Sequence, residues 1–350
     1  MENEIFIYGY FGMGNLGDDL IMLAENEVFS RYAKVRFLAN KGAEDYLGKF
    51  TIKNLLWYMV KGNKKSLLII GGGGLFPKDD YKTALKYLFL RVLARTYIFF
   101  GIGVDPLQRN SRVIQWIFAK SGGSIFRDSG SRENAGIKGR DGMICADVVP
   151  CFWESVLAGV RGAEWSNQSF EYAIVPQGSE KQDTLEFYKA IVGKLTDSGN
   201  RVVLVPFKEP EDRAFSHKLK LLYPSIEIAS ERIEEKLSVI RKSQMVISQR
   251  FHGVILALLY KKKFVPVIYD HKFEYLLDEL QWELPRFYLS LDLKGHLKRK
   301  MVTKPEEVLH FIENIEDISY QSYQQRFDRW RAVSRNMYEV FLERIFSSKA

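Results

Sequence analysis

The stretch that decides the fold is residues 248–253, SQRFHG, which lies between two apolar runs. Residues 245–247 (MVI) are typical of a buried strand, and residues 253–260 (GVILALLY) have the composition of the helix that follows. Arg250 and His252 then fall on the turn between this strand and this helix. Open α/β sheets keep their ligand-binding residues on such turns. The stretch therefore predicts an α/β fold and one place where its chemistry occurs.

The residue types of this turn fit a small anion. Arg250 offers a planar fork of donors to a carboxylate or phosphate, and His252 is of the residue type that changes charge near neutral pH. Ser248 and Gly253 complete the turn, and the backbone amides of a helix start favour an anion in front of them. The alternative is structural: Arg250 pairs with a carboxylate of the fold, and His252 caps the helix.

Length and composition indicate a globular chain of two domains. With 350 residues the chain exceeds one ordinary core and suits two domains of about 150 residues each. Hydrophobic residues make up 46% and charged residues 27%, which excludes a disordered chain. The net charge of +8 suits an acidic substrate or a phospholipid surface. No nucleic-acid partner is expected, because the basic residues are scattered and no recognition module is visible.

The ends of the chain and its cysteines indicate an intracellular protein. The first residues, MENEIFIYGY, lack a basic segment ahead of an apolar one, and no apolar run approaches the roughly 18 residues of a membrane span. Cys145 and Cys151 have neither metal-ligand nor redox spacing, so we expect ordinary buried thiols. We therefore expect a cytoplasmic protein, either free or peripheral on the inner face of the membrane.

The N-terminal part opens as strand, glycine loop and helix, the beginning of a Rossmann-like unit. Residues 12–17 (GMGNLG) match the dinucleotide-binding fingerprint letter for letter. However, Asp18 and Asp19 stand where the helix start would hold a pyrophosphate and would repel it. The next strand also ends at Asn40, without the acidic residue that holds a ribose. We therefore expect the glycines to admit another chain segment or a sugar close to the backbone.

The same pattern repeats along the first half of the chain. Apolar runs at residues 66–70, 97–100, 123–126 and 143–146 each stop at glycine or a charged residue, as in a parallel sheet buried on both faces. The carboxyl ends of such strands lie along one edge of the sheet. The candidate site residues at this edge are Gly12, Asn15, Asp18, Asp19, Gly72, Gly73 and Asp147. Arg127 lies on the same edge and either contacts a substrate or is a paired structural charge.

The pattern restarts after a polar connection at residues 164–169. Strands are expected at residues 172–175, 202–205, 245–247 and 264–268. Lys272 follows the last of them and either adds a second positive charge near His252 or is a solvated surface charge. Residues 320–346 mix aromatic residues with arginines, as in a basic amphipathic helix that packs on its own protein or lies on a membrane.

These patterns together predict an α/β protein with two Rossmann-like domains facing across a cleft, followed by C-terminal helices. The first domain is expected at residues 1–165. The second is expected at residues 166–310. Residues 311–350 are expected to form helices that pack back on the body or lie at the membrane surface.

Taken in order, these elements resemble the polysaccharide pyruvyl transferase family over roughly residues 5–280. The most specific pieces are GYFGMGNLGDD near the start and the Ser-x-Arg-x-His block of ISQRFHG. The other matching pieces are IIGGGGLF, FFGIG, FRDSGSREN, ADVVP, VPFKEPED and PVIYDHK. The sequence departs from the family at Phe251, where Leu is common, at Lys208, where His is frequent, and after Pro176. These departures bear on the sugar acceptor more than on the reaction.

The resemblance implies a fold like that of the GT-B glycosyltransferases and a transferase that needs no metal or cofactor. The donor would be phosphoenolpyruvate, whose pyruvate becomes a cyclic ketal on two hydroxyls of one sugar while phosphate is released. The acceptor would be a bacterial exopolysaccharide, capsule or cell-wall polysaccharide, or its precursor linked to a lipid diphosphate. His252 would be the general acid, with Arg250 as the second catalytic residue. The first domain would be on the acceptor side and the second on the donor side. Donor-binding residues would be Arg127, Lys272, Ser248 and Gly253, and acceptor-binding residues would be Gly12, Asn15, Asp18, Asp19, Gly72, Gly73 and Asp147. The base is left open among Asp18, Asp19 and Asp147.

Two other functions remain open. A nucleotide-sugar glycosyltransferase would share the fold and the acceptor class but would release a nucleotide instead of phosphate. A noncatalytic polysaccharide-assembly protein would keep the cleft but bind no phosphoenolpyruvate. An NAD-dependent enzyme ranks below both, because of the acidic residues that follow the glycine loop.

Overall fold

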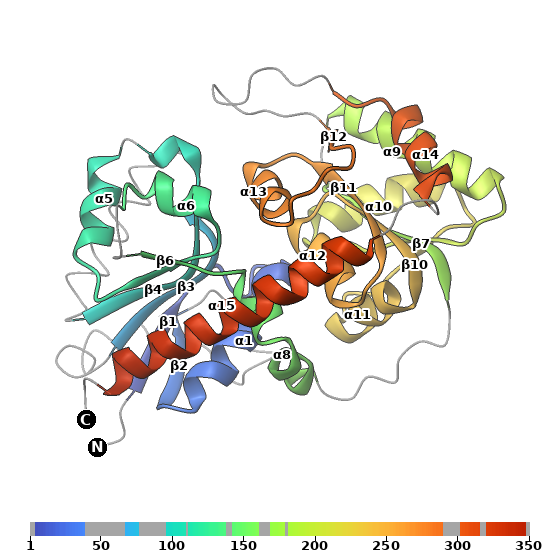
Figure 1. Cartoon of the computed structure of the whole chain (residues 1–350). Coiled ribbons are helices and arrows are strands. Elements are labelled where there is room, and N and C mark those ends of the chain that lie inside the picture. The colour runs from blue at the N-terminus through green and yellow to red at the C-terminus, as the bar shows by residue number, and fades with distance from the viewer. Residues whose placement is uncertain are drawn as a thin grey trace. The chain divides into compact units, whose positions relative to one another are not determined.

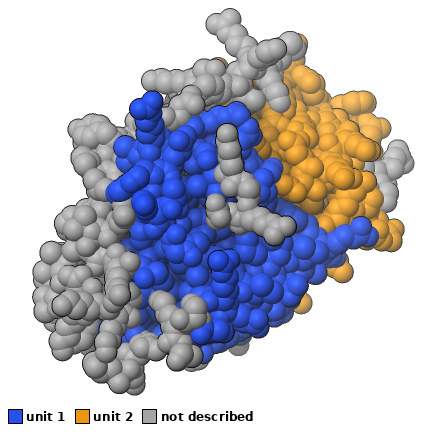
Figure 2. Space-filling view, turned by 60° about the vertical axis from the view of Figure 1, so that its left-hand side comes forward, with its two compact units in different colours: residues 1–13, 17–159, 328–350 blue, residues 14–16, 160–327 orange. Residues whose placement is uncertain are grey.

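A computed structural model of the chain describes residues 4–38, 67–76, 96–109, 111–137, 142–160, 169–178, 181–289, 302–315 and 320–347. They form two compact units, each built on its own parallel sheet (Figure 1). Figure 2 colours the first unit, residues 1–13, 17–159 and 328–350, blue and the second unit, residues 14–16 and 160–327, orange. The predicted domain boundary at residue 165 lies outside the described residues.

The sheet of the first unit has six parallel strands in the order β2-β1-β3-β4-β5-β6. The strands are β1 (Glu4–Tyr8), β2 (Lys34–Leu38), β3 (Leu67–Phe76), β4 (Thr96–Val104), β5 (Ser124–Phe126) and β6 (Gly142–Ile144). The helices are α1 (Leu16–Ser30), η1 (Pro106–Gln108), α5 (Arg112–Ala119), α6 (Ser129–Asn134), α7 (Val148–Cys151) and α8 (Trp153–Gly159). Because β2 and β3 lie on opposite sides of β1, the chain changes direction across the sheet between β1 and β3.

The glycine run at residues 71–74 lies inside a strand of the first unit. The sequence predicts that the third strand stops at residue 70, but β3 continues through the glycines to Phe76. Its register with β4 pairs Gly71 with Phe100 and Gly73 with Ile102. The prediction was wrong at this point because glycine, which usually weakens a strand, here leaves room for neighbouring groups to pack on the strand.

The core of the first unit is built from aromatic and aliphatic side chains between the sheet and α5. Ile114, Ile117 and Phe118 form the buried face of this helix. The Phe118 ring lies 4.1 Å from the ring of Phe99 and 5.2 Å from that of Phe126, measured between centroids. The part of the sheet that holds β4 and β5 is therefore fixed by a continuous apolar contact.

The second unit has a parallel six-stranded sheet in the order β12-β11-β10-β7-β8-β9. The strands are β7 (Phe170–Val175), β8 (Val202–Leu204), β9 (Glu227–Ile228), β10 (Ser243–Ser248), β11 (Lys263–Ile268) and β12 (Phe287–Tyr288). The helices are α9 (Gln182–Asp197), α10 (Glu211–Leu222), α11 (Ile233–Lys242), α12 (Phe251–Leu259), α13 (His271–Glu279) and α14 (Pro305–Glu313).

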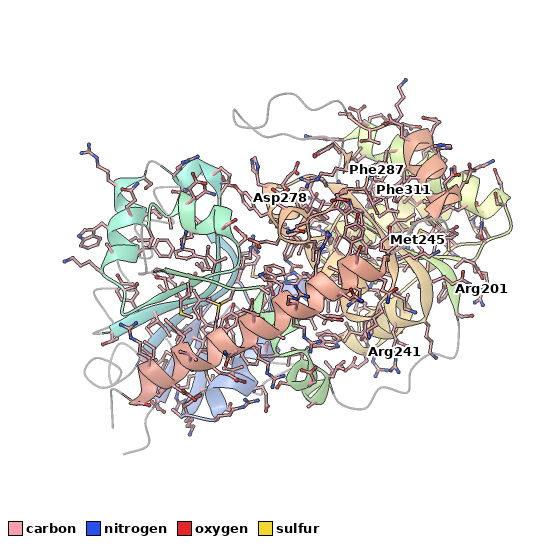
Figure 3. All side chains as sticks on the ribbon, in the orientation of Figure 1. Arg201, Arg241, Met245, Asp278, Phe287 and Phe311 are labelled. Atoms are coloured by element: carbon pink, nitrogen blue, oxygen red, sulfur yellow. The ribbon has the colours of Figure 1, made fainter. Side chains whose placement is uncertain are left out.

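One face of this second sheet is covered by α9, α10 and α14. Met245, Phe287 and Phe311, labelled in Figure 3, belong to the same buried cluster. The Phe287 and Phe311 rings meet edge to face with centroids 5.3 Å apart, so α14 packs on the outer strand β12. The strand and helix expected on either side of the SQRFHG turn are both present, as β10 and α12.

The last helix, α15 (Gln321–Ser347), packs on the protein through one side. In the second unit, the Tyr323 ring lies 4.6 Å from that of Trp282. In the first unit, Ser334 Oγ accepts a hydrogen bond of 2.7 Å from the amide of Ala146, and the Tyr338 hydroxyl donates one of 3.0 Å to the carbonyl of the same residue. Across the described ranges, no helix is both long and apolar enough to span a bilayer.

Candidate active site

The turns after β7, β8, β10 and β11 lie at the carboxyl ends of neighbouring strands in the second unit. β7 stands in the middle of the sheet, with β8 on one side and β10 on the other. The chain therefore changes direction between β7 and β10, and open α/β sheets bind their ligands at such a point. The turns begin at Pro176, Val205, Gln249 and Tyr269.

The turn after β10 is shaped by Ser248, whose side chain is fully buried. Its hydroxyl donates to the Arg250 carbonyl at 2.8 Å and accepts from the Arg250 amide at 3.1 Å. A Cβ on Gly253 would lie 2.1 Å from Ser248 Oγ, so only glycine fits there. The two residues that we expected to bind the donor thus hold the backbone that presents Arg250.

The Arg250 guanidinium is held by the buried carboxylate of Asp212. Arg250 donates from Nε to Oδ2 at 2.9 Å and from Nη2 to Oδ1. The same carboxylate accepts the backbone amides of Gly178 at 2.7 Å, Lys208 at 2.8 Å and Phe207 at 3.2 Å. Asp212 is 0% exposed. It therefore ties the turns after β7 and β8 to the arginine that follows β10.

Burial alone would lower the pKa of Arg250, but the charge and hydrogen bonds of Asp212, together with Tyr269, outweigh burial and raise that pKa above its usual value. The sequence analysis did not select Asp212 as a site residue, although Asp212 ends the VPFKEPED segment that resembles the family. A signal was present: Asp212 shares one face of α10 with the buried residues Phe215 and Leu219. An acidic side chain at an apolar position of a helix needs a partner inside the protein.

His252 lies in the first turn of α12, just after Arg250, which begins the helix without a capping side chain. Its side chain is half-buried. The imidazole meets the Phe251 ring nearly at a right angle, with centroids 5.3 Å apart. Because Arg250 is the N-cap residue of α12, the alternative in which His252 caps this helix does not hold.

Lys272 follows β11, the strand beside β10. Its Nζ lies 3.1 Å from the Tyr269 hydroxyl and 3.5 Å from Asp270 Oδ2. The Tyr269 hydroxyl also contributes to the raised pKa of Arg250. Tyr269, which sequence reasoning did not select, therefore stands between the two cations.

In the first unit, Arg127 follows β5 and is nearly buried, with 8% of its surface exposed. A Cβ on Gly103 of β4 would lie 2.5–2.7 Å from atoms of its guanidinium, so this glycine makes room for the arginine. Arg127 Nε lies 3.3 Å from Asp128 Oδ2. Burial raises the pKa of Asp128 although Arg127 and Ser131 act to lower it. Asp128 also begins α6, where its Oδ1 accepts the Ser131 amide at 2.6 Å.

The glycines of β3 face α1. An added Cβ would lie 2.2 Å from Glu25 at Gly71, 2.0 Å from Ile21 at Gly72 and 2.9 Å from Asp18 at Gly73. These glycines thus make room for a helix of the same unit. Gly74, the last of them, has no atom within 4 Å of its Cβ position.

The acidic candidates of the first unit differ in their surroundings. Asp19 is buried and its Oδ1 accepts the Gly12 amide at 3.2 Å. Asp147 is buried and begins α7, where its Oδ1 accepts the Val149 amide at 3.0 Å. Asp18 is half-buried, in the first turn of α1. Two of the three therefore support the backbone, whereas Asp18 is the more accessible carboxylate.

Asn15 belongs by its contacts to the second unit. It forms an antiparallel bridge with Lys208. On either side of it, the Leu16 amide donates to the Phe207 carbonyl and the Glu209 amide donates to the Gly14 carbonyl, both at 2.8 Å. The backbone of the glycine loop thus supports the same turn whose amides bind Asp212.

The structure therefore groups the candidates in two sets. The second unit holds Asn15, Ser248, Arg250, His252, Gly253 and Lys272, and the first unit holds Gly12, Asp18, Asp19, Gly72, Gly73, Arg127 and Asp147. Among the described side chains, no cluster of His, Cys, Asp and Glu is arranged to hold a metal ion.

Comparisons with known proteins bear on the family and the fold of the chain. The family model described as polysaccharide pyruvyl transferase matches residues 15–271. No curated protein matches the chain in sequence. Among solved structures, MnaA of S. aureus with UDP is 8% identical with a TM-score of 0.64, covering 99% of this chain and 97% of that one.

Two further structures are similar over nearly their whole length. UDP-GlcNAc 2-epimerase of Neisseria meningitidis bound to UDP-GlcNAc is 10% identical with a TM-score of 0.63, covering 98% of this chain and 100% of that one. UGT2 of Phytolacca americana is 10% identical with a TM-score of 0.56, covering 99% of both chains. At such identities the likeness concerns the fold alone. With the two parallel sheets, it confirms the expected α/β class with two Rossmann-like domains of the GT-B type.

Proposed function

Because the chain belongs to the polysaccharide pyruvyl transferase family, we propose that it transfers pyruvate from phosphoenolpyruvate to a sugar of a bacterial cell-surface polysaccharide or of its lipid-linked precursor. The product is a cyclic ketal, and phosphate is released. The observation that carries this proposal is the Arg250 and His252 turn, fixed by Asp212 at the point where the second sheet changes direction. The reaction takes place in the cytoplasm, with the protein either free or peripheral on the membrane.

The donor brings a carboxylate and a phosphate, and each cation has a separate part in binding them. Arg250 gives Nε and one Nη2 proton to Asp212 and makes a further hydrogen bond with Tyr269. These contacts hold the guanidinium in a fixed plane, and the N–H groups that they leave over are the ones proposed to bind an anion. Since Asp212 offsets its charge, Arg250 mainly orients the donor. Lys272 supplies a further positive charge beside it, and Arg127 is the third candidate. Ser248 and Gly253 act through the turn and not by contact.

His252 is the proposed general acid. The reaction begins when a proton is added to the methylene carbon of the donor, which becomes a methyl group and leaves a cationic centre on the neighbouring carbon. One sugar hydroxyl attacks that carbon, phosphate departs, and a second hydroxyl of the same sugar closes the ketal. The start of α12 favours the negative charge of the donor at this point.

Asp18 is the proposed base for the sugar hydroxyl. Asp19 and Asp147 each hold a backbone amide through Oδ1, so loss of their charge would first disturb the fold. Asp18 is the accessible one of the three and lies beside Gly73, at the switch point of its sheet.

The deciding experiment incubates the protein with phosphoenolpyruvate and the host glycan, or its lipid-linked precursor, and measures phosphate. Phosphate release that needs both components, together with a pyruvate ketal detected on the glycan by mass spectrometry, supports the proposal. A nucleotide-sugar glycosyltransferase would release nucleotide from a nucleotide sugar instead. A noncatalytic assembly protein would show neither release nor a thermal shift with millimolar phosphoenolpyruvate.

A further inference from the structure

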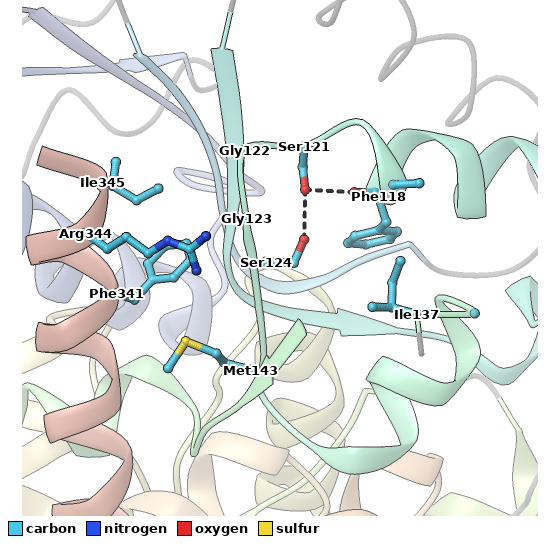
Figure 4. A pocket seen from close by; sticks show the side chains of 12 residues that line it. Phe118, Ser121, Gly122, Gly123, Ser124, Ile137, Met143, Phe341, Arg344 and Ile345 are labelled. Atoms are coloured by element: carbon cyan, nitrogen blue, oxygen red, sulfur yellow. Dashed lines mark hydrogen bonds between the residues drawn. The ribbon is translucent and has the colours of Figure 1, made fainter. Parts of the chain in front are cut away.

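The first unit contains a cavity of about 430 Å³ at the edge of its sheet where β5 and β6 begin (Figure 4). The residues assigned to the reaction follow the other ends of these strands. The apolar part of the lining comes from Phe118 of α5, Ile137, Met143 of β6, and Phe341 and Ile345 of α15. Its volume falls within the roughly 300–1,000 Å³ that small-molecule sites occupy.

The polar wall of the cavity is a pair of serines. Ser121 Oγ donates to the Phe118 carbonyl at 2.8 Å and lies 3.0 Å from Ser124 Oγ. With the Ser121 proton on that carbonyl, Ser124 donates to Ser121, so both hydroxyl protons are used within the wall. The serines therefore do not need a ligand to satisfy them.

Arg344 is the cation of the cavity lining. Figure 4 shows it reaching from α15 toward Gly123. It forms no ion pair or hydrogen bond with any residue in the described ranges, in contrast to Arg331 and Arg335 on the same helix, which both pair with Glu154. Arg344 is exposed, so its donor fork is open to an anion next to the apolar residues of the lining. This combination fits a carboxylate or phosphate carried on a partly apolar body.

We propose that this cavity is a binding site for a small amphipathic organic anion, with its charged group on Arg344 and its apolar part between Ile137, Met143 and Phe341. This proposal does not rest on the reaction described above. The site is separate from the cations at the carboxyl ends of the strands.

The walls of this cavity lead directly to residues assigned to the reaction. Ser124 begins β5, which is only Ser124–Phe126 long and is followed at once by Arg127. Met143 lies in β6, and Asp147 follows four residues later. The wall formed by α15 continues to Tyr338, which is hydrogen-bonded to Ala146. A ligand that restricts the motion of these wall residues is therefore expected to restrict the motion of the segments that carry Arg127 and Asp147.

The test uses the full chain with octanoate as the probe. Acetate, which has the carboxylate but no long alkyl chain, and octanol, which has the alkyl chain but no charge, are the controls. Calorimetry is expected to show octanoate binding at least tenfold tighter than either control. Arg344→Glu should weaken octanoate binding at least tenfold. The matched variant Arg329→Glu makes the same charge change on an exposed position of the same helix, away from the cavity, and should stay within twofold of the wild type.

Hydrogen exchange locates the probe independently of any activity. Octanoate is expected to slow amide exchange in peptides covering residues 117–134 and 142–149 of the wild type but not of Arg344→Glu. Equal octanoate affinity in the wild type and Arg344→Glu would overturn the site. Protection confined to peptides outside the cavity lining would also overturn it. Protection of the lining that stops before Arg127 and Asp147 would overturn the coupling.

Discussion

Both carboxylate oxygens of Asp212 accept hydrogen bonds from the Arg250 guanidinium. The same oxygens also accept hydrogen bonds from backbone amides of the turns after β7 and β8. The pair is nearly closed to solvent, with side-chain exposures of 12% for Arg250 and 0% for Asp212. Removing either residue would leave the charge of the other buried and uncompensated. The arginine of the proposed donor site is therefore also a structural element of its unit.

Asp212→Asn should destabilise the second unit by roughly 3–5 kcal/mol, because the Arg250 charge loses its partner and an amide nitrogen faces backbone donors. Urea unfolding followed by tryptophan fluorescence measures the effect. Glu211→Gln is the matched control: Glu211 is the neighbouring residue and makes a more exposed ion pair of 2.8 Å with Lys208. Its loss should cost no more than about 0.5 kcal/mol. Equal effects of the two variants would contradict the role of Asp212.

His252→Ala should lower phosphate release by about 10²–10⁴-fold, the range expected for loss of a general acid. This variant is a cleaner test than Arg250→Ala, which leaves the Asp212 carboxylate buried without its partner. Steady-state phosphate assays measure the loss, and circular dichroism checks the fold. His217→Ala, on the exposed side of α10, should leave the rate unchanged. Near-normal turnover of the His252 variant would remove the assignment.

Gly103→Ala should displace the Arg127 guanidinium, since the new Cβ would lie within 2.5–2.7 Å of its atoms. We expect the KM for phosphoenolpyruvate to rise about tenfold, which corresponds to about 1.4 kcal/mol of lost binding. Arg127→Met should reproduce the rise. Gly74→Ala provides the control, because no atom lies within 4 Å of its Cβ position. If both substitutions at Gly103 and Arg127 leave KM unchanged, Arg127 does not bind the donor.

Asp18→Asn should reduce turnover while the protein keeps its stability, because Asp18 is half-buried and is proposed to accept the sugar proton. Asp19→Asn and Asp147→Asn should instead lower the free energy of unfolding by about 1–3 kcal/mol, since each carboxylate holds a buried backbone amide. Phosphate assays and urea unfolding of the three variants separate the two effects. Full activity of Asp18→Asn would assign the base elsewhere.

The stability of the first unit should depend on pH through Glu25. Burial raises its pKa well above the usual value, and the charge of Asp147 adds to the rise, against a hydrogen bond from Gly72. The folded state therefore binds this proton more tightly than the unfolded state, so the contribution is present at low pH. It is lost as the pH rises above the unfolded pKa, by up to about 1.4 kcal/mol per pH unit.

Glu25→Gln should therefore show a flatter profile of unfolding free energy than the wild type as the pH is raised from 5 to 8. It should also be the more stable of the two at the upper end. Urea unfolding at several pH values measures both profiles. Parallel profiles would show that Glu25 does not titrate in this way.

The sequence was most informative where the pattern is local. The strand and helix around SQRFHG follow from an apolar run, a polar turn and a second apolar run, and both lie where expected. Local pattern also places Asp18 at the start of a helix. Such features depend on residues a few positions apart, which is the range over which periodicity carries information.

What the sequence did not reveal depends on contacts between distant segments. Asp212 and Arg250 are separated by 38 positions and meet only because β8 and β10 flank β7. A run of four glycines is typical of a loop, and only the contact with α1 shows why it lies in a strand here. Asn15 is grouped with the second unit because its backbone pairs with Lys208, and a pattern of side chains does not predict such a backbone contact.

The fit between α1 and β3 has a consequence for how this chain can vary. Because the glycines of β3 have no side chains, the side chains of Asp18, Ile21 and Glu25 occupy the space next to the strand. A larger residue at any of these glycines requires a smaller side chain at the facing position of α1. Related chains should therefore show compensating exchanges between these two segments, and directed evolution at one should recover changes at the other.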